Sequence, residues 1–258
     1  MSILDKTIAL NADRPLMGMA CYFYDPVLID IAAHLGYDVI WIEMEHALIT
    51  FAQAADLCRI GSGLGMMTMI RIPDARRENV LKAAECGPDI IDLPMANSPE
   101  IAAELVANAR YAPEGSRGFF GSSRAVRYSM GDSIVEEQQR INRHLCLMGQ
   151  IETREAVENV DAICAMPGLD AIFLGPGDMS ASLGVTGQMN HPLVHEAFGR
   201  AVAAAKAHEK KVAMVCAPSE VAHWFGQGVH LFFCGSDVSC VKTGAKAILD
   251  EARKGLTG

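Results

Sequence analysis

The amino-acid sequence predicts an α/β protein, a closed (β/α)₈ barrel (TIM barrel) formed by a single domain over residues 1–258. The first observation is that short β-rich apolar runs alternate with segments in which apolar residues recur three and four positions apart. The second is that eight such pairs occur, the number that closes a barrel. The third is the length, because one barrel takes roughly 250 residues.

The predicted strands are short and almost continuously apolar. They cover residues 17–23, 38–43, 67–72, 89–94, 145–151, 170–175, 211–216 and 230–235. Such runs suit a sheet that is covered outside and filled inside, because a strand facing solvent would alternate polar and apolar residues. A doubly wound open sheet has the same alternation of strands and helices and is the alternative fold.

A segment with helical spacing follows each strand. The predicted helices cover residues 27–35, 51–60, 75–86, 99–110, 154–166, 192–208, 219–225 and 238–254. The pair His191-Pro192 is typical of a helix start. The segment 111–129 is the one long loop, and loops above about 12–15 residues usually have a function or move. Its Arg117 and Arg124 are candidates to bind an acid group of a substrate, to contact a neighbouring subunit, or simply to face solvent.

Composition and charge exclude several classes of protein. The chain has 22 Lys and Arg against 31 Asp and Glu, and this net charge of −9 argues against nucleic acid as a partner. Charged residues interrupt the N-terminal segment, so it lacks the core of a signal peptide, and no apolar run approaches the ~18 residues of a membrane span. Eight cysteines without a C-x-x-C pair suggest buried thiols. We therefore expect a cytoplasmic protein.

Polar side chains gather at the predicted carboxyl ends of the strands, where active sites of such barrels lie. They are Glu43, Glu45, His46, Arg71, Gln150, Glu152 and Asp178. Glu152 and Asp178 follow consecutive strands, and two carboxylates at one mouth form an open site for Mg²⁺ or Mn²⁺. Each also has a simpler interpretation, since an acid favours the N-terminus of a helix or caps a turn.

His46 and Arg71 are the candidate catalytic residues. Glu43 and Glu45 directly precede the histidine, so a carboxylate can orient its imidazole as a general base. Arg71 is a permanent cation at a strand end, where it can stabilise a developing oxyanion. A structural histidine and a surface ion pair are the simpler alternatives.

Four motifs resemble those of the HpcH/HpaI aldolases, which are metal-dependent (class II) pyruvate aldolases on a (β/α)₈ barrel. They are Glu43-Met-Glu-His46, Arg117-Gly118 with Arg124-Ala125, Gln150-Ile-Glu-Thr153, and the run from Pro167 to Gly184 that contains Gly175-Pro-Gly-Asp178. The resemblance covers nearly the whole chain. It implies that Glu152 and Asp178 hold a divalent metal (Mg²⁺, Mn²⁺ or Co²⁺), which a 2-oxo acid substrate chelates.

The resemblance also implies a reaction. Gln150 and the backbone N–H groups of Gly177 and Asp178 would bind the substrate carboxylate. Arg71 would stabilise the keto oxygen as it becomes an enolate, and His46 would promote proton transfer at the C4 hydroxyl. A 4-hydroxy-2-oxo acid would then be cleaved reversibly to pyruvate and an aldehyde, the reaction of a carbon–carbon lyase.

The aldehyde half of the substrate is less defined. Members of the family usually have Asp where this chain has Glu43 and Glu85, and the second acid is expected to pair with His46. Ala20 replaces an aromatic residue of well-known members, so the substrate pocket that it forms with Phe173 is expected to be roomier. Condensation with a keto acid, decarboxylation of an oxaloacetate-like acid and a catalytically silent barrel therefore remain alternatives.

Members of the family are homo-oligomers. The resemblance implies a hexamer built from paired trimers, or a trimer, in which neighbouring subunits close the active site and exchange C-terminal helices. The sequence itself shows that segment 238–254 is amphipathic, so it can pack on its own barrel or on that of a neighbour.

Overall fold

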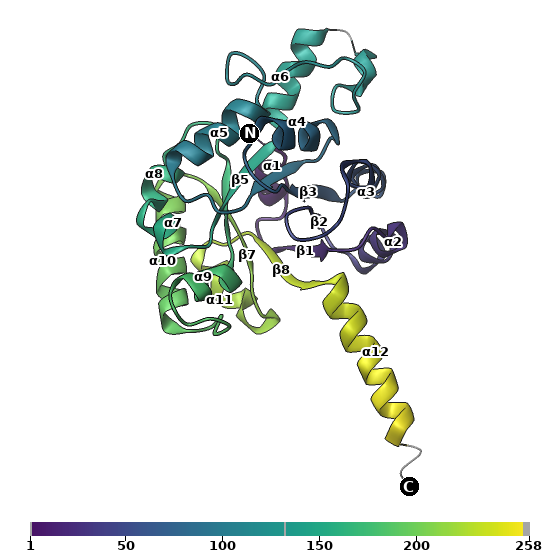
Figure 1. The fold of residues 1–258 in the computed structure, drawn as a ribbon, viewed down its shortest axis with the longest axis vertical. Coiled ribbons are helices and arrows are strands. Elements are labelled where there is room, and N and C mark those ends of the chain that lie inside the picture. The colour runs from purple at the N-terminus through teal and green to yellow at the C-terminus, as the bar shows by residue number, and fades with distance from the viewer. Residues whose placement is uncertain (1, 132, 255–258) are drawn as a thin grey trace.

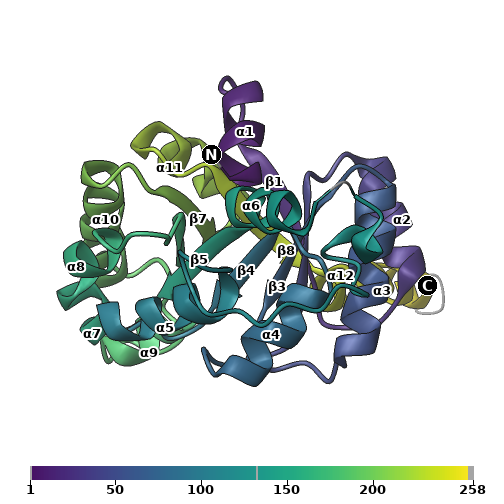
Figure 2. The same ribbon diagram turned by 90° about the horizontal axis from the view of Figure 1, so that it is seen from above.

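The structure, a computed structural model that describes residues 2–131 and 133–254, is a closed barrel of eight parallel strands in chain order (Figures 1 and 2). The strands are β1 (Leu16–Cys21), β2 (Val39–Glu43), β3 (Met67–Arg71), β4 (Ile90–Leu93), β5 (Cys146–Ile151), β6 (Ala171–Leu174), β7 (Lys211–Val215) and β8 (Leu231–Ser236). Each predicted strand is present. Because β1 pairs with β8, the barrel is confirmed and the open sheet is wrong.

Alternate residues of each strand face the inside and the outside of the barrel, and both sets are apolar. In β6, Ala171 and Phe173 belong to the cluster that fills the interior, whereas Ile172 and Leu174 belong to the cluster beneath the helices. Neither face reaches water. This explains why the strands are nearly continuous apolar runs in the sequence.

Helices surround the barrel (Figure 2). They include α2 (Pro26–Leu35), α3 (Phe51–Gly63), α4 (Arg77–Glu85), α5 (Pro99–Ala109), α7 (Arg154–Glu158), α8 (Val160–Cys164), α9 (Pro176–Ser182), α10 (Pro192–Ala207) and, after the 3₁₀ turn η2 (Pro218–Glu220), α11 (Val221–Gln227). The side chains of Thr50, Ser98 and Thr153 cap α3, α5 and α7 by accepting a backbone N–H of the first turn. The predicted start of α10 is confirmed, because His191 caps it and Pro192 is its first residue.

A short helix at the N-terminus, α1 (Ile3–Leu10), was not expected from the sequence. Ser2 and Asp5 form a capping box that starts it. Leu4 is 1% exposed and joins the interior cluster beside the first residues of β1 and β8, so α1 covers the N-terminal end of the barrel. The segment is short and charged and follows no strand, so the alternation of strands and helices did not reveal it.

The long segment 110–131 lies at the N-terminal end of the barrel, because α5 runs antiparallel to the strands and ends there. It contains the short 3₁₀ turn η1 (Arg127–Ser129) and leads into α6 (Ile134–His144). Like α1 and α9, α6 is not among the helices that the sequence predicted. Arg110 anchors its start, donating from Nη1 to the carbonyl of Leu145 at 2.9 Å and from Nη2 to Asp170 at 2.7 Å.

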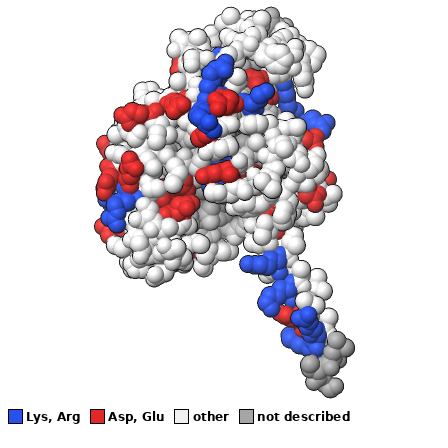
Figure 3. Space-filling model, in the orientation of Figure 1, with Lys and Arg blue, Asp and Glu red and all other residues white. Residues whose placement is uncertain are grey.

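The C-terminal helix α12 (Asp237–Lys254) confirms the amphipathic segment predicted at 238–254, and it projects away from the barrel (Figure 1). Val241 and Ile248 are exposed on it, and basic side chains lie along its length (Figure 3). Within residues 2–131 and 133–254, no helix has both the length and the apolar character that a membrane span requires.

Candidate active site

Polar side chains fill one side of the barrel interior near the carboxyl ends of the strands. The register places Glu43 of β2 beside Arg71 of β3, and Arg71 beside Asp92 of β4. Gln150 of β5 lies on the same inward face, and each of the four residues is at most 6% exposed. Alternate residues of each strand point into the barrel. These inward residues are apolar near the amino ends of the strands and form a polar layer at the carboxyl ends.

Oxygen atoms of three neighbours hold Arg71. Its Nε donates to Oε2 of Glu43 at 2.5 Å, and its Nη1 donates to Oε1 of Gln150 at 3.3 Å and lies 3.2 Å from Oε2 of Glu45. Its Cζ lies 4.9 Å above the ring of Trp41. Nη2 has no partner in the described part of the chain, so it is the donor left for a ligand.

Asp92 is a buried acid that the sequence analysis missed. Its Oδ2 accepts a hydrogen bond from Nε2 of Gln150 at 2.5 Å, whereas Oδ1 is buried without a partner among the described residues. Burial raises the pKa of Asp92 well above its usual range, although the Arg71 charge acts in the opposite direction. A charged residue inside the apolar run 89–94 is the signal that identifies it in the sequence.

Glu43 organises the turn that carries His46. Its Oε1 accepts the backbone N–H groups of Glu45 at 2.6 Å and of His46 at 2.9 Å. The carboxylate nearest the imidazole is that of Glu45, whose Oε2 lies 3.6 Å from Nε2 of His46. Burial raises the pKa of Glu45, and the charges of Arg71 and His46 oppose this shift. The His46 side chain is 63% exposed, so it is open to a ligand at the barrel mouth.

Glu152 follows β5 directly, and its two oxygens have different surroundings. Oε1 accepts the backbone N–H of Met95 at 2.7 Å, while Oε2 lies against Gly175, where a Cβ would be 2.6 Å away. A side chain at position 175 would therefore displace the Glu152 carboxylate. Burial and the charge of Asp178, in the first turn of α9, raise the pKa of Glu152 to about 7.

Acids outnumber cations at this mouth. The carboxyl groups are those of Glu43, Glu45, Asp92, Glu152 and Asp178, and Arg71 interacts electrostatically with four of them. A divalent cation between Glu152 and Asp178 would relieve their repulsion, and carboxylate oxygens are ligands that Mg²⁺ and Mn²⁺ prefer. In the described ranges no cluster of three or more His, Cys, Asp or Glu can hold a metal, so a cation between Glu152 and Asp178 would need water or substrate for its other ligands.

Apolar residues fill the other side of the interior. Trp41 packs edge-on against Phe173 and Phe233, with its ring centroid 5.2 Å from each of theirs. Ala20 and Phe173 are 3% and 1% exposed, so both are packed in the wall of the barrel. Their contact with a substrate stays a prediction.

Glu85 lies away from this site. It is the last residue of α4, which runs antiparallel to the strands and so ends at the N-terminal side of the barrel. Its carboxylate binds Nη2 of Arg117 at 2.8 Å. The expected pairing of Glu85 with His46 is therefore not formed within this chain, and the segment with Arg117 and Arg124 lies at the same distant end.

Comparison with known proteins decides the family. Residues 21–242 match the family described as HpcH/HpaI aldolase/citrate lyase. The chain belongs to this family. The resemblance predicted from its motifs is confirmed, and the protein is a carbon–carbon lyase of the class II pyruvate aldolase family.

Two aldolases and one solved structure illustrate the similarity. The chain is 31% identical to the hydroxypyruvate/pyruvate aldolase of Sagittula stellata over 190 residues. This aligned region is 74% of each protein. It is 27% identical over 248 residues, 96% of each protein, to the 5-keto-4-deoxy-D-glucarate aldolase of Salmonella arizonae. The crystal structure of an HpcH/HpaI aldolase from Desulfitobacterium hafniense matches with a TM-score of 0.90 at 28% identity, covering 98% of this chain and 97% of that chain.

Proposed function

We propose that this HpcH/HpaI family member is a divalent-metal-dependent aldolase that cleaves a 4-hydroxy-2-oxo acid reversibly to pyruvate and an aldehyde. One observation carries the proposal. Glu152 and Asp178 interact electrostatically at the mouth where Arg71 has a free Nη2, and among the described residues the acids there outnumber the cations. This combination suits a metal and a 2-oxo acid that bind together.

Glu152 and Asp178 would hold the metal, Mg²⁺, Mn²⁺ or Co²⁺. The raised pKa of Glu152 supports this role, because burial and the nearby Asp178 charge outweigh the opposing charge of Arg71, so a further cation would be favourable there. When bound, the metal would supply positive charge that stabilises the substrate keto oxygen as it becomes an enolate.

The substrate carboxylate has two sources of hydrogen bonds. The N–H groups of Gly177 and Asp178 lie in the first turn of α9, where they have no partner within the helix. Gln150 directs one amide N–H to Asp92, which leaves the second for the substrate. Phe173 and Ala20 would form the apolar wall beside the bound acid.

Cleavage then needs a base and a stabilised enolate. His46 would accept the proton of the C4 hydroxyl while the C3–C4 bond breaks, so that C4 leaves as an aldehyde and the electron pair enters the pyruvate enolate. Arg71 would donate from Nη2 to the enolate oxygen, where charge grows only in the transition state. A proton delivered to C3 completes pyruvate. Glu85 has no part in this mechanism within one chain, because it lies at the opposite end of the barrel.

We further propose a homo-oligomer, a hexamer or a trimer, in which α12 packs on a neighbouring subunit. Val238, Val241, Ile248 and Leu249 of α12 are exposed by 42% to 74%, and burying such side chains is favourable. Multi-angle light scattering of the full chain and of the Ile248→Lys variant tests this. A monomer for the full chain would contradict it.

The catalytic proposal is tested with a panel of 4-hydroxy-2-oxo acids and, in parallel, oxaloacetate. We expect pyruvate and aldehyde in equal amounts, loss of activity with EDTA, and recovery with Mg²⁺, Mn²⁺ or Co²⁺. Glu152→Ala should abolish turnover without unfolding the protein, whereas Glu155→Ala, an exposed acid on α7, should be normal. Oxaloacetate decarboxylation without aldehyde release from any hydroxy-oxo acid would favour the decarboxylase alternative.

A further inference from the structure

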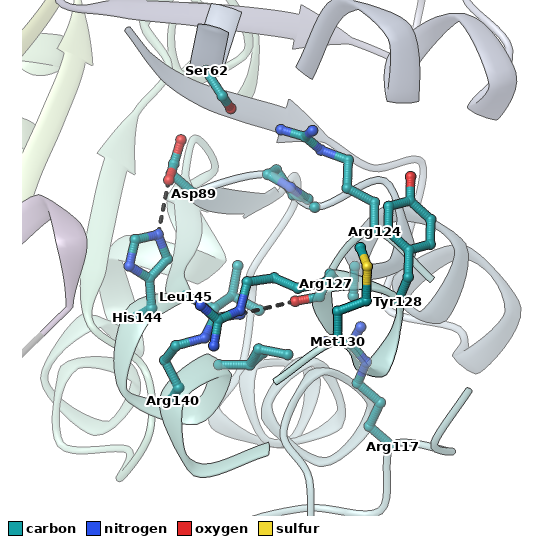
Figure 4. A pocket seen from close by; sticks show the side chains of 15 residues that line it. Ser62, Asp89, Arg117, Arg124, Arg127, Tyr128, Met130, Arg140, His144 and Leu145 are labelled. Carbon is teal, nitrogen blue, oxygen red and sulfur yellow. Dashed lines mark hydrogen bonds and ion pairs between the residues drawn. The ribbon is translucent and has the colours of Figure 1, made fainter. Parts of the chain in front are cut away.

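Two of the pockets outside the barrel interior lie at opposite ends of the barrel. One, of about 410 Å³, is at the N-terminal end, where the contact between His144 and Asp89 forms part of its lining (Figure 4). The other, of about 540 Å³, is bounded by α9, α10, α11 and the carboxyl end of β7. Cys216, the residue directly after β7, lines this second pocket. The second pocket therefore lies outside the barrel, at the same end as the catalytic mouth.

A second cysteine lies beside Cys216 on the neighbouring strand. β7 and β8 are parallel, and Val215 pairs with Phe233. The next residues of the two strands, Cys216 and Cys234, therefore lie side by side, and the backbone N–H of Cys216 donates to the carbonyl of Phe233 at 3.3 Å. Both cysteine side chains pack against the apolar cluster beneath the helices, so they point to the same, outer face of the barrel.

The two thiols are free and interact with each other. A hydrogen bond between them lowers the pKa of Cys234 and raises the pKa of Cys216. At Cys234, burial and the charge of Glu220 oppose this effect without cancelling it. Since the thiolate is the nucleophilic form of cysteine, Cys234 is the better nucleophile of the two and Cys216 is its hydrogen-bond donor.

Glu220 is a charged neighbour of both thiols, but other groups hold its carboxylate. Its Oε1 lies 3.2 Å from Nε2 of His195, and its Oε2 accepts the backbone N–H of Ala217 at 3.3 Å. Both oxygens of the acid therefore have partners of their own. The thiols are left to interact with each other.

Exposure separates these two cysteines from most of the others. Cys216 and Cys234 are partly exposed, and Cys240 is exposed on α12. The remaining five are buried: Cys21, Cys58, Cys86, Cys146 and Cys164. A small reagent that enters the second pocket thus meets Cys216 and, directly beside it, Cys234.

We propose that Cys216 and Cys234 form a redox-active dithiol, a modification site at which a hydroperoxide closes a reversible disulfide between β7 and β8. Adjacent strands lie about 4.7–4.9 Å apart, within the Cα separation of roughly 4.4–6.8 Å that disulfides span. Closure therefore needs rotation of the two side chains and no movement of the strands. The site does not rest on the proposed aldolase function.

The oxidation takes two steps. The Cys234 thiolate attacks one oxygen of the hydroperoxide, so that an S–O bond forms, the O–O bond breaks, and the leaving oxygen takes a proton as water or an alcohol. The Cys216 sulfur then attacks the sulfenic sulfur, so that the S–S bond forms, the S–O bond breaks, and hydroxide leaves with the Cys216 proton as water. The two thiols lose two electrons, which the peroxide gains. A thiol reductant restores both thiols by exchange.

The test uses the full-length wild-type protein, treated with hydrogen peroxide and then with N-ethylmaleimide to block the remaining thiols. Trypsin alone is not sufficient for mapping, because no Lys or Arg lies between Lys211 and Lys242. Within that peptide Glu220 and Asp237 each occur once as their residue type, so digestion with Glu-C and Asp-N separates the three cysteines.

Mass spectrometry without reductant should show the fragment with Cys216 linked to the fragment with Cys234. Its mass should be lower by two hydrogens than the sum of the free fragments. Titration with Ellman's reagent should show the loss of two thiols per chain, and dithiothreitol should restore both.

Three variants assign the roles of the thiols. Cys216→Ser should stop at the sulfenic acid of Cys234, which dimedone labels, whereas Cys234→Ser should leave Cys216 reduced at the same dose of peroxide. Cys240→Ser is the matched control: it removes an exposed thiol outside the pair and should form the disulfide like wild type. Circular dichroism reports whether each variant folds, and the wild-type digest tests the disulfide without any variant.

Three results would overturn the proposal. Peroxide leaves the wild-type protein without a disulfide, either with all thiols intact or with sulfinic acid as the product. The disulfide found by mapping joins Cys240 to Cys216 or to Cys234. The disulfide links two chains, which a non-reducing denaturing gel shows as a covalent dimer.

Discussion

Arg71 and Glu43 form a buried ion pair that joins β3 to β2, with Nε 2.5 Å from Oε2 and side chains that are 8% and 0% exposed. The second carboxylate oxygen of Glu43 accepts the backbone N–H groups of Glu45 and His46. One side chain therefore fixes both the guanidinium and the turn that carries the histidine.

Glu43→Gln should destabilise the protein and reduce turnover. An amide presents N–H groups where the carboxylate accepts from Arg71 or from the backbone, so one buried donor loses its acceptor. Removing one partner of a buried pair costs about 3–5 kcal/mol of unfolding free energy. Urea denaturation measures the loss, and steady-state kinetics measures the decrease in kcat.

A surface pair gives the control for that experiment. Arg14 binds Asp38 at 2.7 Å, but its side chain is 47% exposed. Arg14→Gln should change the unfolding free energy by no more than about 1 kcal/mol, because solvent screens the pair. Equal losses for Glu43→Gln and Arg14→Gln would contradict a special role for the buried pair.

The sequence was sufficient to predict the barrel, because strand and helix periods repeat eight times and each repeat supports the others. It did not predict α1 or α6. Both are short amphipathic helices outside the repeat, and tertiary contacts such as the burial of Leu4 stabilise them more than local sequence does. Their existence depends on the barrel end that they cover.

The site was predictable in outline and less so in its contacts. Strand ends identified Glu43, Arg71 and Glu152, since a barrel gathers the ends of its strands at one mouth. The position of Glu85 was not predictable in this way. Glu85 is on a helix, and the first and last residues of a helix lie at opposite ends of the barrel. Asp92 was missed because it lies within β4, whereas the candidates in the sequence were polar residues at and after the strand ends.

Asp92 should act as a positioning residue for Gln150. Asp92→Asn keeps an oxygen that accepts from Nε2 of Gln150, so it should retain most activity. Asp92→Leu removes the acceptor and should lower kcat/KM by roughly tenfold, the effect of one hydrogen bond to a buried polar group. Kinetics of both variants checks this. Equal activities of the two variants would show that the hydrogen bond has no role.

Gly18→Ala should strongly destabilise the barrel. A Cβ on Gly18 would lie 2.2 Å from the Phe233 ring, and that ring is held between Trp41 and Phe173. Overpacking of this kind costs about 1–3 kcal/mol or more. Gly63→Ala, at the end of α3, meets no atom within 4 Å and should be neutral or slightly stabilising, so thermal unfolding of the two variants separates packing from backbone effects.

The pKa of Glu152 gives a prediction that links pH, metal and stability. In metal-free protein the folded state keeps the Glu152 proton up to about pH 7, whereas the unfolded state releases it near the ordinary value of 4.5. The proton therefore favours the folded state at low pH, and this advantage is lost as pH rises from about 4.5 to 7. The expected decrease in unfolding free energy is up to about 3 kcal/mol.

A divalent metal should reverse the trend, because it binds the deprotonated carboxylates of Glu152 and Asp178 and only the folded state brings them together. The stabilisation by Mg²⁺ or Mn²⁺ should thus be small at pH 5.5 and large at pH 8, measured by thermal unfolding with metal or with EDTA. Other buried acids, such as Glu45 and Asp92, titrate in both proteins, so the difference between wild type and Glu152→Gln isolates one carboxyl group. If the stability of that variant keeps the wild-type dependence on pH and metal, then the cation and the proton do not compete for Glu152.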